Sequence, residues 1–206
     1  GSAFKPFVYI TALKEGYNPS TLVLDAPYVV DQGPGLPKWK PANYTEEFYG
    51  LNTMRTGIEK SRNLMTIRLA DKIGMQKILS TSKDFKISKY IDEKLSMSLG
   101  SGLVTLVDIT NAYGMIVNGG KNINPTMIKS IYSKEGKKIL HNEIKSCENC
   151  NLKSINVNYE IPKINTNQNS VLDSRIAYQI TSMLEGVVLR GTGRKLKDLK
   201  IPLAGK

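Results

Sequence analysis

The chain has 206 residues, which is enough for one domain with a sizeable hydrophobic core. Apolar residues make up 40% of it and charged residues 23%, as in ordinary globular proteins, and no apolar run is long enough for a membrane span or patterned like a secretory signal. The net charge of +11 comes from dispersed Lys and Arg residues. No aromatic pattern of the RNA-binding type accompanies them, so we expect no nucleic-acid partner.

The first predicted helix runs from about Ser2 to Glu15. Pro6 falls in its first turn, where the missing N–H does little harm, and Gly16 ends it. The spacing of Ser2 and Lys5 puts both side chains on one helical face. A lysine that loses water on burial can serve as the base for a serine hydroxyl, so this pair is a candidate nucleophile and base. Alone, Ser-x-x-Lys is a weak signal in a lysine-rich chain.

Residues 17–50 are predicted to be irregular, because they hold several prolines and scattered aromatic residues. They could line a groove or fold as a loop with a small core of its own. A helical pattern resumes at Thr53. After residues 61–63 a second apolar stripe, formed by Met65, Leu69 and Ile73, predicts another helix, which Gly74 ends.

Ser61 and Asn63 lie in the segment that joins these two helices. A loop there can present both side chains into a cleft, where the serine could pass a proton and the asparagine amide could grip a peptide bond. The plainer alternative is that the two residues only end one helix and cap the next.

The second half of the chain predicts two longer helices and a hairpin. Residues 75–102 are expected to form short helices and turns. Thr105 and Asp108 resemble a capping box for a helix that ends at residues 118–120, and we expect its buried stripe to hold Leu106, Ile109, Tyr113 and Ile116. Residues 126–140 predict a β-hairpin and 141–169 a polar loop insertion. The last helix should begin at Ser170-x-x-Asp173 and bury Ile176, Ile180, Met183 or Leu184, and Val187. The chain is therefore expected to be α+β, with a mainly helical body and a small β-hairpin.

Cys147 and Cys150 form a Cys-x-x-Cys pair inside the predicted polar loop. A structural zinc needs four ligands, and His141 is the only histidine, so no metal site is expected. A redox-active pair would open a helix after a strand, which this segment does not predict. We expect a local disulfide or two free thiols, and no cofactor.

Three short motifs are spread along the sequence: Ser2-x-x-Lys5, Ser61-x-Asn63, and Lys206 at the point where a Lys-Thr-Gly would begin. With them stand the runs Trp39–Tyr44, Leu99–Ser101 and Gly191–Arg194. On these residues the chain resembles the transpeptidase domain of a class A, bifunctional penicillin-binding protein of the Gram-negative type. The similarity covers nearly all of residues 1–206, apart from about 141–169.

The resemblance implies a penicillin-binding protein and serine β-lactamase-like transpeptidase fold, of which this chain would hold chiefly the helical part. It also implies a DD-transpeptidase. Ser2 would attack the D-Ala-D-Ala carbonyl of a peptidoglycan stem peptide, with Lys5 as its base. Ser61 would relay the proton to the departing D-alanine, Asn63 would hold the amide on the acyl side of the substrate, and Lys206 would attract the substrate carboxylate. β-Lactam antibiotics would acylate Ser2 in place of the substrate.

The resemblance carries further expectations about activity and location. The Thr and Gly of the third motif do not follow Lys206, nor does the strand that would supply an oxyanion-hole N–H. Losing one such donor costs on the order of 10²–10³ in rate, so we expect the chain by itself to be impaired. The parent protein would be anchored in the cytoplasmic membrane with this domain in the periplasm, where a Cys147–Cys150 disulfide would fit.

Two alternatives remain beside the transpeptidase. A serine β-lactamase would share Ser2, Lys5 and Ser61, but it needs a glutamate that activates a deacylating water, and no such residue stands in a recognisable loop. A non-catalytic piece of a larger protein, which only packs or binds partners, would explain the incomplete third motif.

Overall fold

A computed structural model describes the chain except for residues 32, 88, 143–144, 149–162 and 167–168. The α-helices are α1 (Lys5–Lys14), α2 (Met54–Glu59), α3 (Asn63–Ile73), α4 (Met75–Asp84), α5 (Leu106–Val117) and α6 (Ser174–Leu189). Short 3-10 helices are η1 (Ser2–Phe4), η2 (Leu95–Leu99) and η3 (Arg194–Leu199). In the part of the chain described here, no helix is both long and apolar enough to cross a bilayer.

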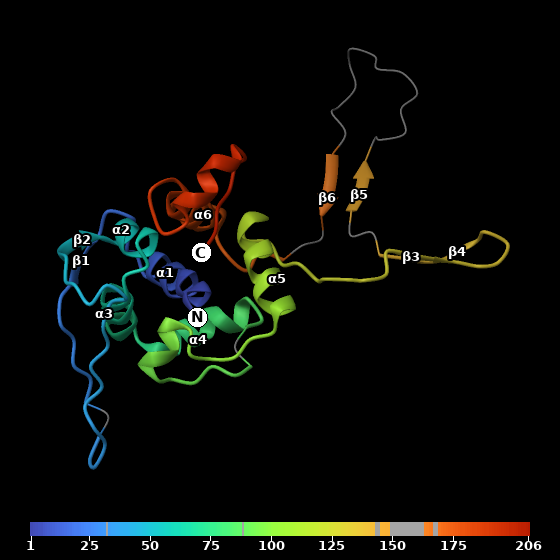
Figure 1. The fold of residues 1–206 in the computed structure, drawn as a ribbon. Coiled ribbons are helices and arrows are strands. Elements are labelled where there is room, and N and C mark those ends of the chain that lie inside the picture. Colours follow the sequence, from blue (N-terminus) through green and yellow to red (C-terminus); the bar gives the residue numbers. More distant parts are fainter. Residues whose placement is uncertain (32, 88, 143–144, 149–162, 167–168) are drawn as a thin grey trace.

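Helix α1 lies at the centre of the helical body, surrounded by the other helices (Figure 1). All its residues from Lys5 to Leu13 are buried. A helix that is apolar all round belongs in the interior of a domain, and the run from Phe7 to Ala12 has that character. Lys5 is the exception, a buried cation in the first turn of this helix. The helix predicted over Ser2 to Glu15 is thus confirmed, with η1 as its start.

The surrounding helices are amphipathic and turn their apolar stripes toward α1. The predicted stripe of Met65, Leu69 and Ile73 on α3 is buried, and Gly74 ends that helix. On α6 the predicted inward residues Ile180, Met183, Leu184 and Val187 are buried, and Ile176 is partly so.

Two details of the helix predictions were wrong. Leu106 was placed in the buried stripe of α5 but is 81% exposed, because the first turn of α5 extends beyond the core, whereas Met115 is buried. The last helix was expected to begin at Ser170, but the N-cap of α6 is Asp173. The predicted cap of α5 is confirmed, since Thr105 Oγ1 accepts a hydrogen bond from the N–H of Asp108 at 3.1 Å.

Short antiparallel strand pairs complete the α+β fold. Strand β1 (Leu22–Asp25) pairs with β2 (Gly50–Thr53), a sheet that the prediction of an irregular segment at 17–50 missed. β3 (Ser130–Tyr132) and β4 (Lys138–His141) confirm the hairpin predicted at 126–140. β1 packs against α3 and brings the fully buried Asp25 next to the segment that joins α2 and α3.

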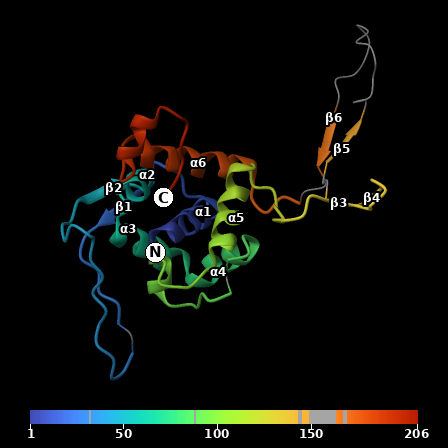
Figure 2. The same ribbon diagram turned by 45° about the vertical axis from the view of Figure 1, so that its right-hand side comes forward.

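Strand β5 (Lys145–Glu148) pairs with β6 (Lys163–Thr166), so the predicted loop insertion at 141–169 contains a strand pair. Figures 1 and 2 show that β3 to β6 project from the helical body. Cys147 lies in β5, whereas Cys150 falls outside the described residues. The state of the two thiols therefore stays a prediction.

Candidate active site

Ser2 lies at the exposed N-terminal end of the central helix, and three contacts hold its segment. The main-chain N–H of Phe4 donates to the oxygen of Gly1 at 3.0 Å, and the hydroxyl of Tyr113 on α5 donates to the oxygen of Ala3 at 2.8 Å. Gly100 has a positive φ of 84°, and a Cβ there would lie 1.9 Å from the oxygen of Gly1. The start of the chain can pack against the end of η2 only because this residue is glycine.

Lys5 places its ammonium group directly beneath the segment between α2 and α3. The Nζ atom donates to the main-chain oxygen of Ser61 at 2.8 Å, to Ser61 Oγ at 3.1 Å and to Asn63 Oδ1 at 2.6 Å. These bonds use all three protons of the charged form. Burial, and then the positive charge of Lys206, lower the pKa of Lys5 to about 7. A substantial fraction of Lys5 is therefore neutral near neutral pH and can accept a proton.

Ser61 occupies a left-handed backbone conformation at the end of α2, with φ of 59°. The N–H of Arg62 donates to the oxygen of Gly57 at 2.9 Å, and that of Ser61 to the oxygen of Ile58 at 3.2 Å. This pair of bonds is the Schellman motif, in which the left-handed position is usually glycine. A serine with φ in this region costs about 1–3 kcal/mol of local strain, which points to a role beyond ending the helix.

Ser61 connects Lys5 to Ser2. Its hydroxyl receives a hydrogen bond from Lys5 and donates one to Ser2 Oγ at 3.3 Å. Within the described part of the chain no direct hydrogen bond joins Lys5 to Ser2. The expected nucleophile and base are thus coupled through Ser61, and the role of Ser61 as a proton relay to the leaving group stays a prediction.

Asn63 begins α3 and faces the same space. Its Oδ1 accepts from Lys5, and its Nδ2 donates to the oxygen of Ala42 at 2.8 Å. An asparagine amide has two N–H donors and two lone pairs on its oxygen. One donor and one acceptor site therefore remain, which is what a substrate peptide group would need.

Lys206 is the fifth predicted residue, and its side chain enters the site from the end of the chain. Its Nζ donates to the main-chain oxygen of Ile58 at 2.7 Å, and burial lowers its pKa to about 8. It lies close enough to Lys5 to lower the pKa of that residue as well. At pH 7 Lys206 is mostly charged, so it brings a cation to the site.

These side chains converge on one pocket of about 400 Å³. Ser2, Ser61, Asn63 and Lys206 line it, and Lys5 contacts Ser61 and Asn63 from the buried side. Sequence reasoning missed the other lining residues, which are Asn43, Tyr44, Thr45, Lys60, Arg62 and Thr192. Asn43 and Tyr44 belong to the run Trp39–Tyr44, yet no spacing rule assigns them to the pocket. No group of three or more candidate metal-binding side chains occurs in the described ranges.

A serine hydroxyl coupled through a second serine to a buried lysine of lowered pKa defines a class of site: a Ser–Lys site suited to acyl transfer. The family model for the penicillin binding protein transpeptidase domain matches residues 1–206, the whole chain. The chain therefore belongs to the transpeptidase domain family of penicillin-binding proteins, and the membership predicted from the sequence is confirmed.

Relatives named penicillin-binding protein 1A match the chain over its full length. The protein of Rickettsia bellii is 44% identical over 207 residues, which is 100% of this chain and 26% of the relative. The protein of Pseudomonas aeruginosa is 32% identical over 240 residues, or 100% of this chain and 29% of the relative. The chain thus spans about a quarter of the length of these relatives.

Solved structures agree on the fold. Penicillin-binding protein 1A from Haemophilus influenzae superposes with a TM-score of 0.81 and 26% identity, over 96% of this chain and 32% of that one. The D,D-transpeptidase domain from Eggerthella lenta gives a TM-score of 0.75 at 18% identity, over 100% of this chain and 52% of that one. The expected penicillin-binding protein transpeptidase fold is therefore confirmed.

Proposed function

We propose that the chain is the acyl-transfer part of a peptidoglycan DD-transpeptidase, in which Ser2 forms an acyl-enzyme with a stem peptide ending in D-Ala-D-Ala. The observation that carries this proposal is the hydrogen-bonded series Lys5, Ser61 and Ser2. It supplies a nucleophile, a relay and a base within one pocket, and the family membership supplies the substrate class.

Acylation begins from neutral Lys5, whose free lone pair lets Ser61 donate to Lys5 and Ser2 donate to Ser61, the reverse of the directions in the charged form. Ser2 Oγ attacks the carbonyl carbon of the penultimate D-Ala while its proton passes to Ser61 Oγ, and the proton of Ser61 passes to Lys5 Nζ. The tetrahedral oxyanion forms at the N-terminal end of the central helix, where backbone N–H groups and the helix dipole favour negative charge. When the intermediate collapses, the proton returns through Ser61 to the departing D-Ala nitrogen. The C–N bond breaks and an ester to Ser2 remains.

Deacylation uses the same groups in reverse. The amine of a second stem peptide attacks the ester carbonyl and loses its proton through Ser61 to Lys5, and Ser2 Oγ leaves with a proton from the same path. The new amide bond is the cross-link. The chemistry needs no cofactor.

Asn63 and Lys206 would hold the substrate. The free donor and acceptor of the Asn63 amide match a peptide group on the acyl side. The Lys206 ammonium attracts the terminal carboxylate of the stem peptide or the carboxylate of a β-lactam, and Lys60 adds a second cation at the pocket. A β-lactam would acylate Ser2 by the same first step and leave a slowly hydrolysed ester.

No carboxylate is among the described residues that line the pocket. A serine β-lactamase needs a group that activates water against the acyl-enzyme, and this lining does not provide a glutamate or aspartate for that purpose. The pocket therefore favours a transpeptidase over the hydrolytic alternative.

The location of the substrate sets the location of the domain. Peptidoglycan lies outside the cytoplasmic membrane, so we place the domain on the periplasmic side. We propose that the protein containing it is anchored to that membrane. The support is the similarity of the whole chain to about a quarter of the length of bacterial penicillin-binding proteins 1A.

A labelled penicillin tests the proposed function. We expect one covalent adduct per chain by intact mass spectrometry, mapped to the peptide that contains Ser2, and no adduct on the Ser2→Ala variant. The speed of labelling tests the separate prediction that the chain by itself reacts slowly. Repeated turnover of a chromogenic cephalosporin beyond one equivalent would instead favour a β-lactamase. An unlabelled chain that β-lactams do not stabilise against heat would favour the non-catalytic alternative.

A further inference from the structure

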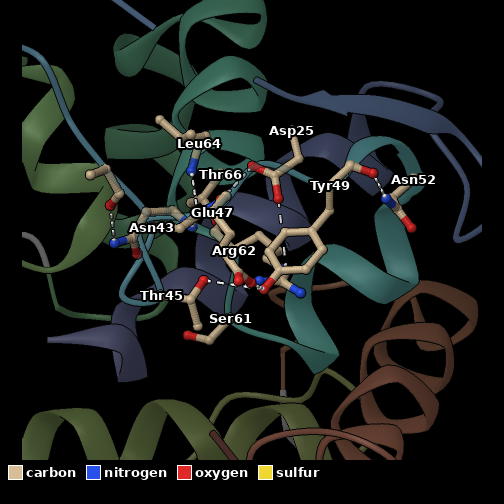
Figure 3. Close-up of polar contacts among 12 residues, drawn as sticks. Asp25, Asn43, Thr45, Glu47, Tyr49, Asn52, Ser61, Arg62, Leu64 and Thr66 are labelled. Atoms are coloured by element: carbon tan, nitrogen blue, oxygen red, sulfur yellow. Dashed lines mark hydrogen bonds and ion pairs between the residues drawn. The ribbon is translucent and has the colours of Figure 1, made fainter. Parts of the chain in front are cut away.

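Asn43 is a buried side chain that joins the pocket to the interior of the domain (Figure 3). It is only 4% exposed. Its Oδ1 accepts from the main-chain N–H groups of Asn63 at 2.9 Å and Leu64 at 3.3 Å. Its Nδ2 donates to Asp25 Oδ1 at 2.7 Å and to the oxygen of Glu47 at 2.9 Å. The hydrogen-bonding capacity of this amide is therefore fully used within the protein.

These contacts cap helix α3 from a distance. The first N–H groups of a helix have no partner within the helix and are normally satisfied by the side chain of the N-cap residue. The N-cap of α3 is Arg62, and its side chain makes no such bond. Asn43, 20 residues before Asn63, provides the acceptor instead. The direction in which α3 starts, and so the place of Asn63, depends on this amide.

Asp25 anchors the amide. It is fully buried at the end of β1, and its Oδ2 has no hydrogen bond but lies 3.8 Å from Nε of Arg62. The guanidinium of Arg62 also lies 3.3 Å above the ring of Tyr49. One carboxylate thus contacts both Asn43, which bonds the first N–H groups of α3, and Arg62, which directly follows Ser61.

The turn needs such support because Ser61 is in a strained conformation. A residue other than glycine keeps a left-handed backbone conformation only when contacts with the surrounding structure hold it there. Its position matters, because Ser61 Oγ must lie within reach of both Lys5 and Ser2. No hydrogen bond from the Asn43 side chain goes to any of these three side chains in the described structure.

We propose that Asn43, anchored on the buried carboxylate of Asp25, is a positioning residue that fixes the Ser61–Asn63 turn for acyl transfer. The effect on acylation rests on the proposed function. The structural part of the proposal, which is that Asn43 holds the start of α3, rests on the contacts above alone. It assigns Asn43 no contact with the reacting atoms.

Two measurements on Asn43→Asp and Asn43→Ala test this role. The aspartate variant keeps an oxygen that can accept from the α3 N–H groups, but it places a second carboxylate against that of Asp25. The alanine variant removes the acceptor altogether. We expect the hydrogen-exchange rates of the Asn63 and Leu64 amides, measured by NMR, to rise about tenfold or more as the turn opens locally. We expect the rate constant of acylation by a labelled penicillin to fall about tenfold or more, because small misplacements are costly, and to fall by a larger factor than its non-covalent affinity.

Asn52→Ala is the matched control. Asn52 lies in the same region, and in the described structure its side chain donates to the oxygen of Tyr49 at 2.8 Å, so its loss removes this hydrogen bond and none of those that Asn43 makes (Figure 3). Exchange and acylation in this variant should stay within about threefold of the original chain. The pair Asp25→Asn with Asn43→Asp should recover part of the lost rate, because the new amide at position 25 can donate to the carboxylate at position 43.

The outcomes separate the two proposals. Faster exchange at Asn63 and Leu64 in a chain that takes no penicillin label would retain the structural part and overturn the proposed function. Unchanged exchange in a folded Asn43 variant, or unchanged acylation despite faster exchange, would overturn the positioning role. If neither Asn43 variant folds, Asp25→Asn decides. We expect about threefold faster exchange at the same amides, and an unchanged rate would overturn the proposal.

Discussion

The side-chain oxygens of Ser61 and Ser2 lie 3.3 Å apart, although the two residues are 59 positions apart in the sequence. Ser61 reaches this point because it sits at the left-handed position of a Schellman motif, two residues before Asn63, whose main-chain N–H donates to Asn43. The same conformation puts its main-chain oxygen 2.8 Å from Lys5 Nζ. The backbone of one strained residue thus couples the proposed nucleophile to its base, and this coupling leads to the following predictions.

Replacing Ser61 should separate stability from activity. Ser61→Gly and Ser61→Ala both lose the hydroxyl, but only glycine relieves the positive φ of 59°. We expect the glycine variant to be more stable than the alanine variant by about 1 kcal/mol, measured by urea unfolding at pH 7. Both should acylate with penicillin at least about 100-fold more slowly than the original chain, because the proton path is broken. An alanine variant as stable as the glycine variant would show that Ser61 is not strained.

The pKa of Lys5 should govern the pH dependence of acylation. Because the neutral amine is the base and its pKa is about 7, the acylation rate constant should fall about tenfold per pH unit well below pH 7 and level off above it. Lys5→Arg carries a charge that cannot be removed, and it should lower the rate about 100-fold or more at every pH. Penicillin labelling from pH 5.5 to 9 measures the profile. A rate independent of pH across this range would exclude Lys5 as the base.

Lys206 provides a separate test of the same electrostatics. Its charge lowers the pKa of Lys5, so Lys206→Gln should raise that pKa and move the acidic limb of the profile to higher pH. The variant should also bind β-lactam carboxylates more weakly, by about tenfold at low salt, since an ammonium partner of the carboxylate is lost. A limb that stays in place would show that the two lysines do not interact.

Sequence patterns predicted the elements whose cause is local. Helices α3 and α6 follow from apolar periodicity with Gly74 and Asp173 near their ends, and the central helix from Pro6 in its first turn and Gly16 just after its end. The pairing of β1 with β2 could not be foreseen, because each strand has only four residues and the partners lie 25 or more positions apart. Leu106 follows the helical period and still faces solvent, since periodicity does not reveal where the core ends.

The site shows the same division. Spacing made Ser2 with Lys5 and Ser61 with Asn63 candidate pairs, the resemblance to the family added Lys206, and the fold brings all five to one pocket. Neither the spacing nor the resemblance revealed that Ser61 stands between Ser2 and Lys5, because the left-handed turn depends on the Schellman bonds at the end of α2. Asn43 escaped notice because the α3 N–H groups that it caps are 20 and 21 residues away, a separation that leaves no trace in local spacing.

The two buried lysines should also link stability to pH. Lysine in an unfolded chain titrates near pH 10.4, whereas the folded chain lowers the pKa of Lys5 to about 7 and that of Lys206 to about 8. Between pH 7 and about 9.5 the unfolded state binds more protons, so the free energy of unfolding should rise with pH. The contribution is at most about 1.4 kcal/mol per pH unit for each lysine, and the full cost of burying the charges is present below pH 7.

Lys5→Met isolates one of these contributions. The slope of unfolding free energy against pH, from urea titrations at pH 7, 8 and 9, should decrease by up to about 1.4 kcal/mol per unit. The window stops near pH 9.5 because burial raises the pKa of the Tyr9 and Tyr113 hydroxyls, and these groups reverse the trend once unfolded tyrosine ionises near pH 10. Equal slopes in both chains would mean that Lys5 keeps its ordinary pKa in the folded state.

The ion pair between Glu59 and Arg190 should respond asymmetrically to the loss of either partner. Arg190 Nη2 lies 2.6 Å from Oε1 and its Nε lies 3.2 Å from Oε2 of Glu59, yet the Glu59 side chain is 7% exposed and the Arg190 side chain 54%. Arg190→Met leaves the buried carboxylate with Arg55 at 3.8 Å, and we expect a loss of about 1–3 kcal/mol. Glu59→Gln leaves a guanidinium that water can solvate, so its cost should be below about 1 kcal/mol. Urea unfolding at pH 7 measures the loss of unfolding free energy in each variant. A larger loss in Glu59→Gln than in Arg190→Met would contradict the prediction that the buried carboxylate is the partner that needs the ion pair.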